Sequence, residues 1–250
     1  MNLPGKNVKF PLSGHALTRV GLLAVGFALC LGGCAPIPAG PEEYSAGRAR
    51  VVLPSTDWED LGASNEVLPL HPMPAAFPLQ TRAVGLRGAN KELLAVILVQ
   101  TNRTNAARGL TLWTGDCAPQ KDLWVVDVAA ASPIRIDCLR FKRSANQDDW
   151  MEKSYPALVR WMDEHRAEVK GPYSHVSYRF ATDGGAYVNV NAIVDQRLLS
   201  PKPRNNEEFL AAGLPAQKWS LQVAEAARIS AGMVDGFFAV PPFPLPVPNK

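Results

Sequence analysis

An apolar run near the middle of the chain constrains the fold more than any other stretch. From Glu92 to Gln100 the residues between the two ends are apolar at odd and even positions alike. A strand of this kind must be covered on both faces, as in the middle of a sheet. Periodicity alone would also allow a buried helix, but the β-branched content and the preceding Asn90 favour a strand. We therefore expect a central strand in a sheet with two covered faces.

The clearest local signal is a hairpin around Asp183, Gly184 and Gly185. The flanking segments, residues 173–182 and 186–195, alternate between apolar and polar side chains. This alternation is typical of an antiparallel sheet with one wet face. That face either is simply solvated or holds a polar ligand. The candidate ligand residues on it are His175, Ser177, Arg179, Asn189 and Asn191.

The remaining pattern predicts further strands and two main helices. Proline at 69, 72, 74 and 78 predicts irregular structure over residues 66–80. The apolar phase of residues 134–141 shifts after Cys138, which predicts a β-bulge there. A helix over 146–169 should either kink at Pro156 or begin again there with Ser154 as its N-cap. Another helix should run from Pro215 to about Val234, and the residues expected on its core-facing side are Trp219, Val223, Ala226, Ser230 and Met233. Other expected strands are residues 50–53, 79–86, 110–113 and 123–128, and a linker is expected at 198–203.

Together these elements predict an α+β fold. We expect a mostly antiparallel sheet packed by a central helix, residues 146–169, and by the C-terminal helix. The cysteines predict one disulfide, between Cys117 and Cys138, if the chain enters an oxidising compartment. The alternative, a two-cysteine metal site, would need further ligands, and the sequence has no Cys-x-x-Cys or His-x-x-x-His spacing. No metal and no other cofactor is expected.

The first 33 residues have the composition of an export signal. They contain Lys6, Lys9 and Arg19, no acidic residue, and an apolar run from Val20 to Leu31. That run is shorter than the roughly 20 residues that span a bilayer. Small residues follow it and lead directly to Cys34.

The stretch Leu31, Gly32, Gly33 and Cys34 resembles the lipobox of bacterial lipoproteins. The resemblance covers only the leader and implies cleavage before Cys34, followed by lipidation of that residue with a diacylglycerol and a fatty acyl chain such as palmitate. Two or more acyl chains anchor a protein stably. Ala35, in place of an aspartate, favours the outer membrane by lipoprotein sorting patterns. The alternative is an ordinary signal anchor with a buried cysteine.

These features divide the chain into four parts. Residues 1–33 are the expected signal peptide, 34–47 a Pro-rich tether, 48–240 the globular domain and 241–250 a Pro-rich tail. The tail would either bind a partner or lie along its own domain. Cleavage would leave 217 of the 250 residues and would lower the formal net charge from +3 to zero, because three basic residues leave. A neutral domain gives no electrostatic case for nucleic acid.

The sequence contains no motif that defines an enzyme class. It has no Gly-x-Ser-x-Gly elbow, no His-Glu-x-x-His and no phosphate-binding loop. We therefore expect a non-enzymatic lipoprotein of the outer membrane that faces the periplasm as an adaptor or ligand-binding module. Its expected partners are the membrane, through the lipid anchor, and an envelope protein. The alternatives are an envelope hydrolase and a subunit of a secretion or surface assembly.

Overall fold

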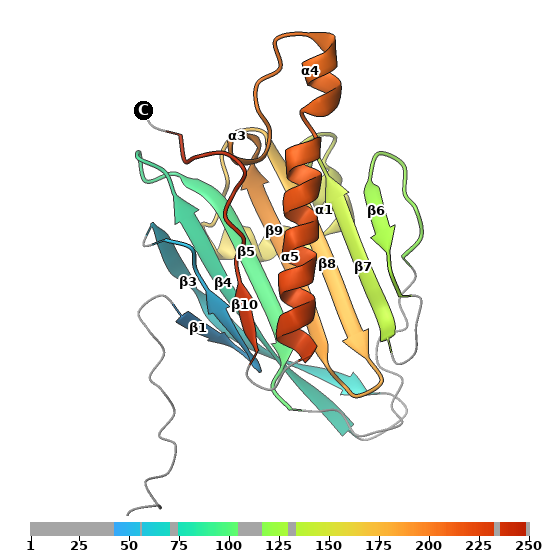
Figure 1. Cartoon of the computed structure of the whole chain (residues 1–250). Helices are drawn as coiled ribbons and strands as arrows, with labels where there is room; N and C mark the ends of the chain where they lie inside the picture. The colour runs from blue at the N-terminus through green and yellow to red at the C-terminus, as the bar shows by residue number, and fades with distance from the viewer. Residues whose placement is uncertain are drawn as a thin grey trace, which may run out of the picture. The chain divides into compact units, whose positions relative to one another are not determined.

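The apolar run forms the centre of a seven-stranded antiparallel sheet in the computed structural model of this chain (Figure 1). Strand β5, Leu93–Asn102, pairs with β4 on one side and β9 on the other. Every residue of β5 except Gln100 is buried. Side chains of both alternations pack, some into each of two separate apolar clusters. The prediction of a central strand with two covered faces is confirmed.

The structure describes residues 43–55, 57–70, 75–104, 117–129, 134–232 and 236–248. All of them belong to one compact unit, residues 39–250. Within these ranges no helix combines the length and the apolar character needed to cross a membrane. The predicted signal peptide, the lipobox with Cys34 and the expected strand at 110–113 lie outside the described residues.

The large sheet has the order β3-β4-β5-β9-β8-β7-β6, and every neighbouring pair is antiparallel. The hairpin around Gly184 joins its two best-predicted strands, β8 and β9. This sheet and its covering helices confirm the predicted α+β fold. Besides β5, the strands are β3 (Trp58–Leu70), β4 (Ala75–Arg87), β6 (Trp124–Asp127), β7 (Ile134–Lys142), β8 (Tyr173–Thr182) and β9 (Tyr187–Asp195).

A second, small sheet joins the beginning and the end of the described chain. Strands β1 (Glu43–Ala46) and β2 (Ala49–Val52) form a hairpin, and β10 (Phe237–Ala239) pairs parallel to β2. Gly47 lies in the hairpin turn with φ 59°, and a Cβ there would collide with Thr101 of β5. Strand β1 falls inside the segment expected to be a tether. Residues 43–46, ahead of the expected domain boundary at residue 48, therefore belong to a described sheet, because β1 pairs with β2.

Helix α5, Leu214–Gly232, covers one face of the large sheet. Its inner side buries Trp219, Val223 and Ser230, three of the residues expected to face the core, while Ala226 is half-buried. Met233, also expected there, lies outside the described residues. Two short helices precede α5: α3 (Gln196–Leu199) and α4 (Asn206–Ala211). Helix α3 replaces the first part of the expected linker, because Leu198 and Leu199 are both buried in the core.

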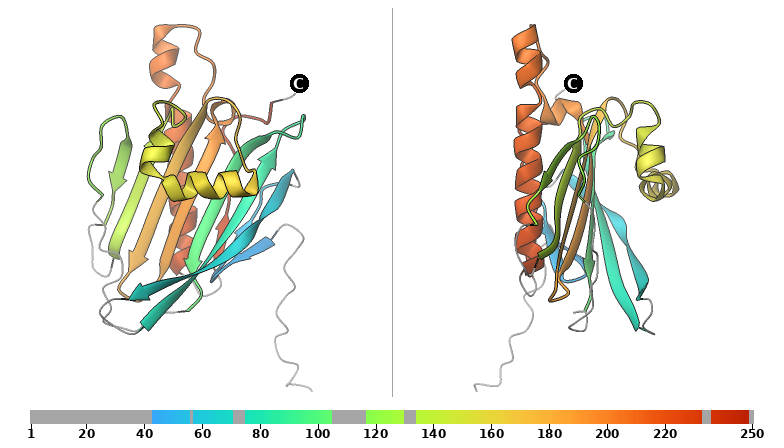
Figure 2. Two further views of the ribbon diagram at one scale, coloured as in Figure 1. Left: turned by 180° about the vertical axis from the view of Figure 1, so that it is seen from behind. Right: turned by 90° about the vertical axis from the view of Figure 1, so that its right-hand side faces the viewer.

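Helices α1 (Trp150–Ser154) and α2 (Pro156–His165) cover the opposite face, as Figure 2 shows. Of the two alternatives expected at Pro156, the structure has a new helix, because the proline cannot continue α1. The expected N-cap is wrong: Ser154 is the last residue of α1, and Tyr155 is the N-cap of α2, without a side-chain hydrogen bond. Met151, Leu158 and Met162 pack with Leu98 of β5 and Ile193 of β9. The sheet is therefore the middle layer of three.

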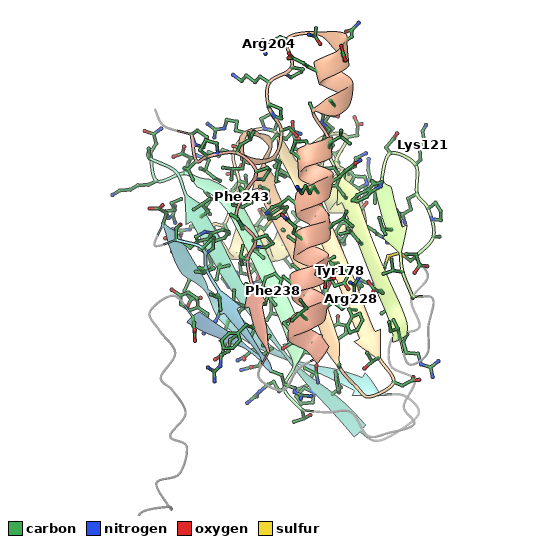
Figure 3. The ribbon with its side chains drawn as sticks, viewed as in Figure 1. Lys121, Tyr178, Arg204, Arg228, Phe238 and Phe243 are labelled. Atoms are coloured by element: carbon green, nitrogen blue, oxygen red, sulfur yellow. A yellow bond between two sulfur atoms is a disulfide. The ribbon has the colours of Figure 1, made fainter. Side chains whose placement is uncertain are left out.

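The Pro-rich tail lies along its own domain. Phe243 stacks against Trp58 and Trp219, with ring centroids 6.0 and 5.0 Å apart, and the indole Nε1 of Trp219 donates to the carbonyl of Pro241 at 3.1 Å. Figure 3 shows Phe238 and Phe243 beside α5. Of the two alternatives for the tail, the structure has the arm packed on its own domain.

Two local predictions are wrong. Residues 66–80 are mostly strand, in β3 and β4, because Pro69 lies on an edge strand and Pro78 lies just before the β4–β5 ladder begins at Leu79. The bulge expected near Cys138 is also absent from β7. Its register is continuous from Ile136 to Lys142, and the irregularity lies between Ile134 and Ile136. The apolar phase shifts because both faces of β7 are buried.

Candidate functional site

The predicted disulfide is present near the β6 edge of the sheet. Cys117 and Cys138 are bonded, with their Cα atoms 5.6 Å apart, and join the segment before β6 to the middle of β7. Both cysteines are buried in a small cluster with residues of β4, β7, β8 and β9. The disulfide therefore forms an apolar wall on the sheet face that α1 and α2 partly cover.

The five candidate ligand residues share that same face, as predicted. Across the β8–β9 ladder Ser177 lies opposite Asn191, and Arg179 lies opposite Asn189. They lie in a strip between the apolar cluster that α1 and α2 cover and the apolar cluster around the disulfide. The Oδ1 atom of Asn189 is buried without a hydrogen-bond partner among the described residues. The strip is polar, but its members have different surroundings.

His175 is buried and cannot contact a ligand from solvent. Its side chain is only 1% exposed and lies under two aromatic rings, Trp150 and Tyr155, at 5.8 and 4.3 Å between ring centroids. Its Nε2 lies 3.2 Å from Oδ1 of Asn191. The polar face expected around His175 is therefore lost at this end, because α1 and α2 cover it.

Burial also makes His175 a source of pH dependence. Desolvation lowers the pKa of His175 to about 4, against the opposing effect of the Asn191 hydrogen bond. In the unfolded chain a histidine titrates near 6.5. Between these two values the unfolded state binds a proton that the folded state does not. Stability is therefore intact above about pH 6.5 and falls as the pH drops toward 4, by up to about 1.4 kcal/mol per pH unit.

We expect His175→Gln to remove this contribution. Wild type should lose on the order of 3 kcal/mol more than the variant between pH 7 and pH 4, measured as the free energy of unfolding in urea at a series of pH values. The control is His165→Gln, which removes an exposed histidine of α2 and should leave the wild-type slope unchanged. Equal slopes for wild type and His175→Gln would contradict the burial of a neutral imidazole.

A pocket opens in the strip between the helices and the disulfide. Its volume is about 230 Å³. Two of its lining residues, Ser177 and Arg179, are candidates from the sequence, and Arg140 extends the same face onto β7. The full lining is Gln120, Ile136, Cys138, Arg140, Ser154, Tyr155, Ser177 and Arg179.

The described charged side chains of this pocket are basic. Its described lining contains two arginines and no aspartate, glutamate or histidine. The side chain of Arg179 is exposed and has no ion pair or hydrogen bond within the described part of the chain. It does act on Tyr187: burial raises the pKa of this phenol to about 12, and the positive charge of Arg179 opposes that rise. Arg179 thus presents a guanidinium that no carboxylate of the described chain neutralises.

Sequence reasoning missed half of this pocket. Arg140 lies two residues after Cys138, so simple alternation along β7 places both on one face. The mistaken bulge near Cys138 hid this relation. Gln120, Ser154 and Tyr155 come from loops and helix ends, and no local pattern links them to β8. Asn189 and Asn191, by contrast, are on the predicted face but do not line the pocket.

A larger hollow, of about 640 Å³, lies beside the tail, between residues 200–203 and Leu245. Most of its apolar wall is proline. Its one carboxylate, Asp195, is 1% exposed and accepts three hydrogen bonds from the Arg197 side chain at 2.7 to 3.1 Å. Lys170 and Lys202 also line this hollow and are exposed, so its described ionisable groups are mainly basic.

The opposite face of the sheet contains a buried ionic cluster. The Arg228 side chain of α5 donates to both carboxylate oxygens of Asp137, at 2.9 and 3.1 Å, and the Tyr178 hydroxyl donates to the same carboxylate at 2.9 Å. Figure 3 shows Tyr178 and Arg228 next to each other by α5. Burial and the nearby Asp137 raise the pKa of Tyr178. All three groups satisfy one another, so the cluster fastens α5 to the sheet.

Comparison with protein-family models, with curated proteins and with solved structures finds no match for this chain. Within the described ranges no group of three or more His, Cys, Asp and Glu side chains is placed to hold a metal ion.

Proposed function

We propose that this protein is a lipid-anchored ligand-binding module of the bacterial envelope, held at the outer membrane and facing the periplasm. The anchor is proposed from the lipobox residues Leu31 to Cys34. The binding role is proposed from the pocket. The observation that carries it is the guanidinium of Arg179, which has no ion-pair partner among the described residues and lies in a concave lining without a described acidic residue. The ligand would present a carboxylate or phosphate to that group.

The chemistry of the lining supports an anionic ligand. A guanidinium offers a rigid fork of donors that matches a carboxylate or phosphate through two parallel hydrogen bonds. Ser177, Ser154 and Gln120 supply neutral polar groups around it, while Ile136 and the disulfide supply an apolar wall. A small ligand with one anionic group and an apolar part fits this division.

The pocket favours this proposal over an envelope hydrolase. A hydrolase needs an ionisable base or nucleophile with a second group to orient it. His175 lies under aromatic rings, and Asp137 is saturated by Arg228 and Tyr178. A binding module needs only a concave surface with a donor that can reach a ligand, and Arg179 is our candidate for that donor.

The proposal predicts stabilisation by anions that depends on Arg179. We would follow the thermal unfolding of the full chain in detergent while adding inorganic phosphate, citrate or a short-chain fatty acid. A ligand at about 100 times its dissociation constant should add about 2.7 kcal/mol to the stability of wild type. Arg179→Gln should lose most of this gain.

The matched control is Arg160→Gln, which removes the same charge from an exposed position of α2 outside the pocket. It should respond to each anion as wild type does. Equal responses in all three proteins would mean that the anions act on the general surface, and would contradict a site at Arg179.

A further inference from the structure

The outer side of helix α5 has a row of exposed apolar residues. Three large apolar residues, Leu214, Leu221 and Ile229, are 61, 46 and 51% exposed on it. Their spacing of seven and eight residues places them in one stripe along the helix. No described element lies over this stripe in the views of Figure 2. Single exposed apolar residues are normal, but a row of them along one helix marks a contact surface.

The charged residues in the same stripe are arranged with twofold symmetry. Lys218 and Glu225 are both exposed and alternate with the apolar residues. An axis that crosses the helix between Leu221 and Gln222 lies equally far from Lys218 and Glu225. The same axis lies equally far from Leu214 and Ile229. The stripe is therefore complementary to its own copy turned end for end.

We propose that two copies of this chain associate through antiparallel packing of their α5 helices. About the axis between Leu221 and Gln222, Lys218 of each copy faces Glu225 of the other. Leu214 of each copy faces Ile229 of the other. Such a contact is isologous, since each pair occurs twice, and it closes at a dimer. Opposite charges facing each other across two helices also fix their direction and register.

Two hollows lie beside α5. A hollow of about 560 Å³ lies along the first half of α5, lined in part by Leu214, Trp219 and Phe243. Since Leu214 would face the second copy's Ile229, that exposed side chain would enter this hollow. A second hollow, of about 410 Å³, lies on the side of β6 and β7 and is lined by Leu221 and Val128. Both hollows would add apolar contact to the helix pair.

Glu225 already has a partner within its own chain. It accepts from Arg228 at 2.6 Å, and its side chain is still 59% exposed. Arg228 is held mainly by Asp137. Glu225 can therefore turn one oxygen to the second copy's Lys218 without releasing α5 from the sheet.

The test uses the full chain in cells, with its leader intact. Leu221→Cys places a thiol next to the proposed axis, where the two copies come closest. Oxidation or a short bis-maleimide should then convert most of the protein to a crosslinked dimer on a non-reducing gel. Lys121→Cys, in an exposed loop before β6, is the control for random collision and should give only background.

Charge reversal then tests the register. Adding Lys218→Glu to Leu221→Cys creates two like-charge contacts and should weaken the dimer about tenfold, which corresponds to about 1.4 kcal/mol. Adding Glu225→Lys as well should restore crosslinking, because each new pair again has opposite signs. Crosslinking at the level of Lys121→Cys would overturn the proposal. So would crosslinking that Lys218→Glu leaves unchanged, or a loss that Glu225→Lys does not restore, since another partner or register would then occupy the stripe.

Discussion

Replacing Arg228 by alanine is expected to lower the free energy of unfolding by about 3 kcal/mol. The reason is what the substitution leaves behind. The side chain of Asp137 is only 3% exposed, and Arg228 supplies its one opposite charge within the described chain. Without it, a carboxylate remains in the interior with a single hydrogen bond, from Tyr178. Chemical denaturation of wild type and variant at neutral pH measures the difference.

The matched control for this loss is Arg204→Ala. Arg204 forms an ion pair with Glu208 at 3.2 Å, but its side chain is 86% exposed, so removal should cost at most about 0.5 kcal/mol. A triple replacement, Tyr178→Phe with Asp137→Leu and Arg228→Met, removes both charges and the buried hydroxyl together and should recover most of the stability lost in Arg228→Ala. If Arg228→Ala were no more costly than Arg204→Ala, the ionic cluster would not be what fastens α5 to the sheet.

Replacing Cys34 by serine is expected to abolish membrane anchoring. The proposed anchor consists of acyl chains on this residue, and a hydroxyl cannot replace the thiol in that modification. The variant should move from the membrane fraction to the soluble fraction, or should stay unprocessed with its leader attached. Fractionation of cells, with the mass of the purified chain measured in parallel, distinguishes wild type from variant.

Cys30→Ser serves as the control, since Cys30 lies within the leader that would be removed. It should leave both the mass of the mature protein and its fractionation as in wild type. A Cys34→Ser protein that is still processed and still bound to membranes would contradict the lipoprotein assignment. The domain would then reach the envelope by another route.

The strands that were predicted correctly are those whose own residues define them. Strand β5 is apolar at every position from Leu93 to Val99, and the hairpin around Gly184 has a turn signal between two alternating segments. Prediction from the local sequence was wrong where contacts with other elements determine the conformation. The segment around Pro69 and Pro78 is extended because strand pairing over-rides a composition that is typical of loops. Leu198 and Leu199 form part of a helix because both side chains are buried in the core.

The candidate site was predicted only in part, for a similar reason. Alternation along β8 placed Ser177 and Arg179 on the correct face, but whether that face is open depends on α1 and α2. Those helices cover His175 and leave Arg179 exposed. Ser154 and Gln120 approach the site from other parts of the chain, so only the folded structure brings them to the pocket.

We propose that the pocket at Arg179 binds an anionic ligand in the envelope. This binding can be tested on protein taken directly from cells. The measurement is a native mass spectrum of the full chain extracted in mild detergent, for wild type, Arg160→Gln and Arg179→Gln. We expect wild type and Arg160→Gln to have a non-covalent adduct that is recovered as an anion on dissociation. We expect Arg179→Gln to lack this adduct. An adduct that persists in Arg179→Gln, or wild-type protein with no adduct, would contradict the proposal.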